Sequence, residues 1–468
     1  MHRHNHGLRT LSVGANSAAA GRHWLAGWCL LALAGCAAYH PAPLDEARLN
    51  QALATPAPGR LARQAAHLQQ LRIPPITLDF SRPFTGEELA VIAVLVNPEL
   101  QALRTRERVA QAQVFAAGLL PDPQLAASLD RPSSGQAPDL MSAYNLGVSW
   151  DIAGLLTRKA NQRIARDKAL QVHYDVAWAE WLTANQARLQ AARLHYLAAQ
   201  EAVAREAAAT ADRLYQITRQ NVQRGDATLV DLGLRQVALL DAQDRALTLA
   251  RAREKARQEL NRTLGLPPEM PLPLADRFPL PPQRPLDPAR LFTRAEGARL
   301  DLSALRAGYA SQEGTLYRAI LGQYPRFNLG LGRARDTGGV RTLGFAVTLD
   351  LPLFNRNRGA IAEARATRAQ LYAEYVARLH QTRSDIAALV ADLAEIQRER
   401  TILAEQLPSL DLAEETLRRA VAEGNATLLS YEAVRASYLD KRLKLLSLEQ
   451  AAAEQDVALQ LAIGEAWP

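Results

Sequence analysis

Residues 225–229 read Gly-Asp-Ala-Thr-Leu, and residues 424–428 read Gly-Asn-Ala-Thr-Leu. Each copy interrupts a long stretch of helix-forming residues at a single glycine, so each predicts a tight turn between two helices. Further matches follow in the same order at nearly the same spacing, including Leu100–Arg104 with Leu302–Arg306 and Trp150–Ile152 with Leu349–Leu351. Such an ordered set predicts an internal duplication, with one long helical hairpin in each half.

The helices of this duplicated unit are unusually long. The sequence predicts helices over 86–119, 155–223 and 227–264 in the first half, and over 291–321, 355–423 and 427–464 in the second. The stretch 155–223 contains no proline and would extend for roughly 100 Å as a helix. Thr85 followed by Glu88 predicts a capping box at the start of the first helix. Because helices of this length need lateral support, we expect them to pack in a bundle or a tube.

Four short segments alternate between apolar and polar residues, at 123–130, 143–151, 325–332 and 342–351. Period two predicts β-strands with one apolar face, and their length suits strands that cross a membrane. A soluble antiparallel sheet with one wet face is the alternative. An open four-stranded sheet would leave unpaired backbone groups in lipid. The strands therefore predict a homo-oligomer that shares one barrel, with polar faces lining the lumen and loops 131–142 and 333–341 at the exposed tips.

The N-terminus carries a secretory pattern. Arg22 and His23 precede the apolar run 24–33, which ends in the sequence Leu-Ala-Gly-Cys at Cys36. The run is too short for a stable membrane anchor, so we expect residues 1–35 to be a secretory signal peptide. The Leu-Ala-Gly-Cys ending resembles a bacterial lipobox, which implies a lipoprotein signal peptide and lipidation of Cys36. Ala37 after the cysteine favours the outer membrane. An ordinary signal peptide with a chance cysteine is the alternative. Cleavage would remove Cys29 and the alternating His2, His4 and His6, leaving no thiol pair.

Composition and motifs argue against an enzyme and against a nucleic-acid partner. The net charge is +7 over 468 residues, and arginines alternate with acids along the helices, as on solvated helix faces. The sequence contains no phosphate-binding loop, His-Glu-x-x-His, Cys-x-x-Cys or nucleophile elbow. We expect no catalytic residue, cofactor or metal site, because the remaining histidines lack ligand spacing: His40, His67, His173, His195 and His380.

The domain organisation follows from these segments. Residues 1–35 form the signal peptide and 36–85 the lipidated N-terminal segment, in which Pro74-Pro75 would break any helix. The first repeat covers 86–266, with its turn at 224–229. A proline-rich connector, 267–290, leads to the second repeat, 291–468, with its turn at 423–428.

This order of elements, the two Gly-x-Ala-Thr-Leu turns and the Leu-Ala-Gly-Cys ending resemble the TolC-like outer-membrane efflux proteins. The motif Pro352-Leu-Phe-Asn-Arg-Asn-Arg-Gly359 is most similar to the heavy-metal cation-efflux branch, although 153–158 in the first half lacks it. The resemblance implies a mainly helical trimer with a transmembrane twelve-stranded β-barrel and a periplasmic helical tunnel. It also implies a passive conduit, which meets a periplasmic adaptor protein and an inner-membrane pump of the resistance-nodulation-division type.

The same resemblance assigns roles to residues near the turns. It implies contact with the adaptor at Gly225, Ala227, Thr228, Leu229, Gly424, Ala426, Thr427 and Leu428. Turn geometry alone is the simpler interpretation of these residues. Nearby acids would narrow the closed tunnel and favour cations, although they also fit a solvated helix face: Asp411, Glu414, Glu415 and Glu423. Drug export and a structural role as a periplasmic coiled-coil lipoprotein are the alternative functions, but the second leaves the four amphipathic strands unexplained.

Overall fold

The computed structural model describes residues 39–54, 56–133, 141–276 and 278–466, so Cys36 and the signal segment lie outside the described residues. The chain divides into two units, of which the first ends at Ala54 and the second begins at Thr55. Among the described residues of the first unit, Glu46–Leu53 form helix α2. All other described helices and strands belong to the second unit.

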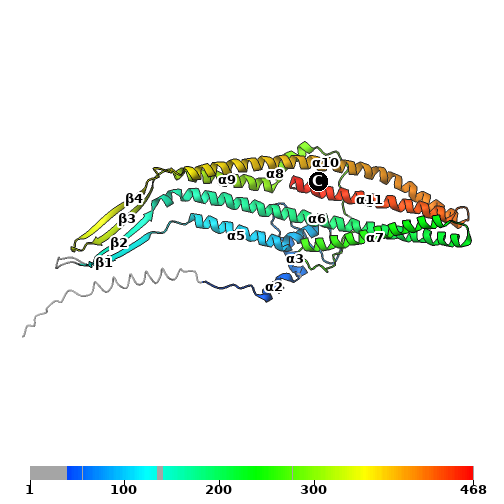
Figure 1. Cartoon of the computed structure of the whole chain (residues 1–468), viewed down its shortest axis with the longest axis horizontal. Coiled ribbons are helices and arrows are strands. Elements are labelled where there is room, and N and C mark those ends of the chain that lie inside the picture. The colour runs from blue at the N-terminus through cyan, green and yellow to red at the C-terminus, as the bar shows by residue number, and fades with distance from the viewer. Residues whose placement is uncertain (1–38, 55, 134–140, 277, 467–468) are drawn as a thin grey trace, which may run out of the picture. The chain divides into compact units, whose positions relative to one another are not determined.

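The second unit repeats one order of elements twice. After α3 (Pro58–Ala66), the first half contains α4 (Gly86–Val96), α5 (Pro98–Gly118), β1 (Gln124–Asp130), β2 (Ala143–Asp151), α6 (Ile152–Arg224) and α7 (Leu229–Thr263). The second half contains α8 (Pro288–Ala298), α9 (Leu300–Leu321), β3 (Arg326–Arg335), β4 (Arg341–Asp350), α10 (Arg358–Ala422) and α11 (Leu428–Ile463). Within this unit the strands lie at one end and both helical turns at the other (Figure 1).

Two of the predicted helices are each split into two. The prediction of one helix over 86–119 is wrong, because Asn97 leaves helical geometry and ends α4, and Pro98 begins α5. The Asn97 side chain then caps α5 by accepting a hydrogen bond from the Leu100 amide. The prediction over 291–321 fails in the same way at Arg299, whose extended backbone separates α8 from α9. No proline marks that second break.

The two long helices form as the sequence predicts, with slightly different ends. Helix α6 has 73 residues and α10 has 65, which correspond to about 110 Å and 100 Å. Helix α10 continues through Pro408, although this residue removes one hydrogen bond from the helix. Lateral packing supplies the support that such helices need, since α6 contacts α4, α5, α7, α9 and α11.

The four strands form one antiparallel sheet in the order β1-β2-β3-β4. Strand β2 of the first half pairs with β3 of the second, so the sheet joins the two repeats. Strand β3 extends three residues beyond the predicted end, to Arg335, and β4 begins at Arg341. Strands β1 and β4 are the two edges of this sheet.

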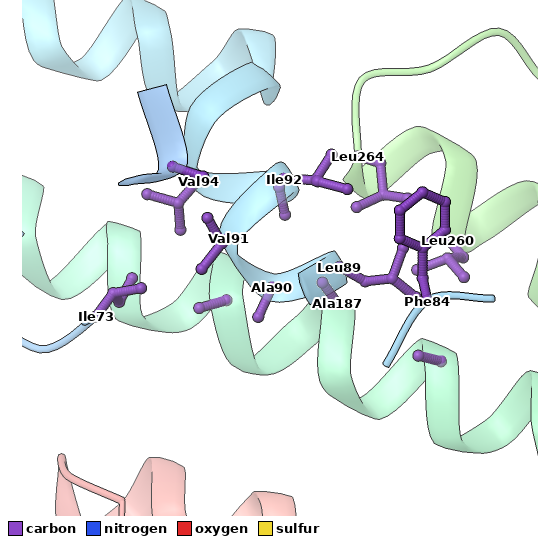
Figure 2. Packing of buried hydrophobic residues seen from close by; sticks show 14 of the residues in the cluster. Ile73, Phe84, Leu89, Ala90, Val91, Ile92, Val94, Ala187, Leu260 and Leu264 are labelled. Atoms are coloured by element: carbon purple, nitrogen blue, oxygen red, sulfur yellow. The ribbon is translucent and has the colours of Figure 1, made fainter. Parts of the chain in front are cut away.

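The largest core surrounds α4, which is apolar on all sides. Its residues from Leu89 to Val94 are all buried, against α6, α7 and the segment before α4 (Figure 2). The predicted capping box forms, since Thr85 and Glu88 exchange hydrogen bonds at the start of the helix. A helix that is apolar all round is stable only when it is enclosed, so α4 holds the first hairpin to the rest of the unit.

The second half has a smaller core in the corresponding place. Here α8 packs on α10 and α11, with Leu291, Ile386, Leu393 and Leu459 buried together. The connector between the halves returns to the first core, because Phe84 exchanges backbone hydrogen bonds with residues 273 and 275. The two halves are therefore built alike and are joined at both the sheet and the connector.

Candidate functional site

The first helical turn ends α6 at Gly225. Its φ of +84° is left-handed, and its amide donates to the Val222 carbonyl at 3.1 Å, while the Asp226 amide reaches Asn221 at 2.8 Å. Thr228 then caps α7, since its hydroxyl accepts from the Asp231 amide and donates to the Asp231 carboxylate. These hydrogen bonds lower the pKa of Asp231. The turn is thus rigidly built.

The second turn repeats this geometry. Gly424 has a φ of +77°, and its amide and that of Asn425 bond to the end of α10 as their counterparts do in the first turn. Thr427 caps α11 by accepting from the Ser430 amide at 3.1 Å. The two turns differ in this cap, because Asp231 of the first turn carries a charge and Ser430 does not.

Apolar side chains are presented at both turns. Leu229 is 76% exposed and Leu428 is 43% exposed. A methyl group added to either turn glycine would meet nothing within 4 Å, so these glycines serve backbone geometry rather than close packing. The structure therefore brings the predicted turn residues into two similar, apolar tips.

A polar network lies behind the second tip and links three helices. Arg435 of α11 donates to Glu206 of α6 at 2.8 Å and to the Tyr431 hydroxyl at 2.7 Å. The Tyr431 hydroxyl donates to Glu414 of α10 at 2.7 Å. Burial, together with this hydrogen bond, raises the pKa of Tyr431. The network ties α11 both to its own hairpin partner and to the first repeat.

A second bridge between the repeats lies beside this network. Arg213 of α6 donates to Glu432 of α11 at 3.1 Å, and Glu432 is only 3% exposed. Sequence reasoning did not identify these residues or Tyr431 and Arg435. The available signal was the Tyr-x-x-x-Arg spacing from 431 to 435, which places both side chains on one helix face.

The predicted gate acids Asp411, Glu414 and Glu415 all lie on α10, but their side chains have different partners. Glu414 contacts Tyr431, as described, and Asp411 lies beside Tyr438 of α11, where burial and this carboxylate raise the pKa of the phenol. Glu415 instead accepts hydrogen bonds from Arg418 and Arg419 on its own helix, which lower its pKa to about 2. Glu415 therefore remains charged near neutral pH, but its charge is paired.

The sheet leaves its apolar row exposed in the single chain. Leu343 is 86% exposed and Phe345 is 67% exposed, and the apolar residues of all four strands share this face, as the register requires. The opposite face carries small and polar residues, with three acids and one arginine at Asp130, Asp151, Asp350 and Arg326. One face suits lipid and the other suits water.

No group of three or more His, Cys, Asp or Glu in the described part of the chain could hold a metal ion. His173 pairs with Glu107, and His195 packs against Tyr196 and Phe278. None of the described helices has a stretch that is both long and apolar enough to cross a membrane.

Two long helical hairpins, α6–α7 and α10–α11, and an antiparallel sheet with one apolar and one polar face are the features that the comparisons have to explain. The model of the outer membrane efflux protein family matches residues 89–266 and 291–465, which is more than half of the chain. The chain belongs to this family. Membership places it among transport conduits of the outer membrane rather than among enzymes.

Several solved structures have the same fold as this chain. The outer membrane protein VceC from Vibrio cholerae is 19% identical, with a TM-score of 0.65 over 82% of this chain and 97% of that one. CusC is 15% identical, with a TM-score of 0.66 over 85% and 97%, and the CmeC outer membrane channel from Campylobacter jejuni is 15% identical, with a TM-score of 0.67 over 81% and 85%. No curated protein matches the chain significantly in sequence.

Proposed function

We propose that three copies of this chain form the outer-membrane channel of a tripartite efflux system. The observation that carries the proposal is the four-stranded sheet, which has an exposed apolar face and two unpaired edges, β1 and β4. Edges cannot remain unpaired in lipid, so β4 of one copy would pair with β1 of the next until the barrel closes. The long helices would continue this barrel as a tunnel through the periplasm.

The two tips are the proposed docking points for partners. A periplasmic adaptor would meet Leu229 and Leu428, whose exposed side chains supply apolar contact. An inner-membrane pump of the resistance-nodulation-division type would supply the energy, and the channel would act as a passive conduit. Two similar tips in each of three copies give a quasi-sixfold ring.

Heavy-metal cations are the proposed cargo. The polar face of the sheet carries Asp130, Asp151 and Asp350 against the single cation Arg326, so the lumen of a trimer would be net negative. The Pro352–Gly359 motif supports the same substrate class. A channel needs no tight metal site, since it must release what enters. Drug export is the competing outcome of the test below.

Purification and a gene deletion test this function. We expect a detergent-requiring trimer that conducts ions in planar bilayers with a preference for cations, and a deletion strain with reduced tolerance to zinc, cobalt or copper. A soluble rod without conductance would instead indicate a structural lipoprotein. Reduced tolerance to antibiotics alone would assign the channel to drug export.

The network behind the second tip is the proposed closing latch. We expect the double variant Tyr431→Phe, Arg435→Ala to raise the open fraction in single-channel recordings by about 5- to 30-fold, for a loss of roughly 1–2 kcal/mol of closed-state stability. The reason is that Arg435 and the Tyr431 hydroxyl bond α11 to Glu206 and Glu414.

The matched control for this latch removes a charge near the tip that pairs within its own helix. Arg419→Ala deletes a partner of Glu415 on α10 and should leave the open fraction unchanged. An equal effect of the control and of the latch variant would contradict the latch and would favour a general effect of charge near the tip.

Cys36 is the proposed lipid anchor. We expect radiolabelled palmitate to be incorporated into the wild-type protein and not at all into Cys36→Ser, because no other cysteine follows the cleavage site. Cys29→Ser is the matched control and should retain the label. Label in Cys36→Ser would assign the acyl chains elsewhere.

A further inference from the structure

Three arginines interrupt the apolar face of the sheet close to the loops. Residues directly opposite each other on neighbouring strands share a face. Arg333 lies opposite Leu343, and Arg335 lies opposite both Tyr144 and Arg341. Arg333, Arg335 and Arg341 therefore continue the apolar row at the end of the strands that is remote from the helices (Figure 1).

This arrangement is unfavourable without an anion. Arg335 and Arg341 are direct cross-strand partners, and like charges in that position destabilise a sheet. Among the described residues, none of the three arginines forms an ion pair with a carboxylate, and the nearby Asp336 accepts from the Val340 amide in the turn. The face consequently carries three positive charges beside apolar side chains.

Arg335 is held in place at the centre of this group. Its guanidinium lies over the Tyr144 ring, 5.3 Å from the centroid, and donates to the Ser142 carbonyl at 2.9 Å. Its Nε is buried and has no hydrogen-bond partner among the residues that the structure describes. A guanidinium held by one hydrogen bond and one ring contact keeps further Nη–H donors that can bind an anion beside it.

We propose that Arg333, Arg335 and Arg341 bind the phosphate groups of a phosphorylated glycolipid in the outer leaflet of the outer membrane. The proposal rests on the proposed function, which puts the helices in the periplasm and hence the strand loops at the outer surface. Arginine forks bind phosphate with two hydrogen bonds each, and residues two apart on a strand are only about 7 Å apart.

The apolar row explains why the occupant is a lipid rather than free phosphate. Leu331, Leu343 and Phe345 lie next to the arginines on the same face and are exposed. Acyl chains would cover these side chains while the headgroup meets the charges. Tyr144 beside Arg335 is placed where aromatic residues border a membrane.

Binding of a defined glycolipid to the purified trimer tests the proposal. The probe is diphosphorylated lipid A, compared with the same glycolipid after removal of its phosphates, by native mass spectrometry. We expect the triple variant R333Q, R335Q, R341Q to bind the phosphorylated form at least about tenfold more weakly. The control variant R163Q, R290Q, R398Q removes equal charge from exposed helix positions and should bind normally.

A single substitution covers the case in which the triple variant fails to assemble. Without lipid, Arg341→Gln should equal or exceed the wild type in thermal midpoint, because it removes the repulsion with Arg335. Diphosphorylated lipid A should raise the thermal midpoint of the wild type more than that of Arg341→Gln. The wild type should then have the higher midpoint of the two. An unchanged order would overturn the proposal.

Other outcomes separate this inference from the channel function. Equal binding of phosphatidylglycerol vesicles, or full competition by inorganic phosphate, would overturn the assignment to an outer-leaflet glycolipid. A trimer that conducts ions but binds diphosphorylated lipid A no better than the dephosphorylated glycolipid would refute this inference alone. A protein that neither forms trimers nor conducts would refute the proposed function itself.

Discussion

Val347→Arg should abolish the assembled channel in the outer membrane. Val347 lies near the middle of β4 on the apolar face, opposite Leu329, and is exposed in the single chain. An arginine on the lipid face near the bilayer centre costs about 2–4 kcal/mol, and a trimer would bear three of them. We expect the trimer band on semi-denaturing gels of outer-membrane fractions to disappear.

The neighbouring residue supplies the control for this experiment. Thr348 lies on the polar face, opposite Asn328, so Thr348→Arg adds the same side chain toward the proposed lumen. We expect normal amounts of trimer with lower cation conductance. If Val347→Arg assembled as well as Thr348→Arg, the apolar face would not contact lipid.

Leu229→Asp combined with Leu428→Asp should reduce efflux to the level of the deletion strain. Burying a leucine side chain is worth about 1.5–3 kcal/mol, and the carboxylate adds a cost of desolvation. Both side chains are exposed, so the folded chain loses little packing. We expect at least about a 100-fold loss in adaptor affinity, measured with the purified adaptor.

The double variant must be shown to retain its structure. Its trimer content and its conductance in planar bilayers should match those of the wild type. Leu229→Met with Leu428→Met preserves the apolar tip and should sustain efflux. Normal efflux by the aspartate variant would show that Leu229 and Leu428 serve only the turns.

Much of the fold could be predicted because its signals are local. Only a residue that tolerates positive φ can reverse the chain after α6 and after α10, so Gly225 and Gly424 mark both turns in the sequence. Alternation at period two marks each strand, and an uninterrupted helical composition marks α6. Repetition of these signals revealed the duplication.

The breaks within the shorter helices were harder to predict. The pair Asn97-Pro98 is a local signal for the break between α4 and α5, although the prediction of one helix over 86–119 did not use it. Arg299 carries no such signal. Its guanidinium bonds to the nearby Asp301 and also to the distant Ala462 carbonyl of α11. Tertiary packing decides that break.

The sequence by itself determined the duplication, the extent of the two long helices, the strand faces and the two turns, since each depends on neighbours within a few residues. Only the tertiary structure decided which charged residues meet. The contacts of Arg435 with Glu206 and of Arg213 with Glu432 join residues more than 200 positions apart. These contacts are set by how the long helices pack, a property that no local pattern contains.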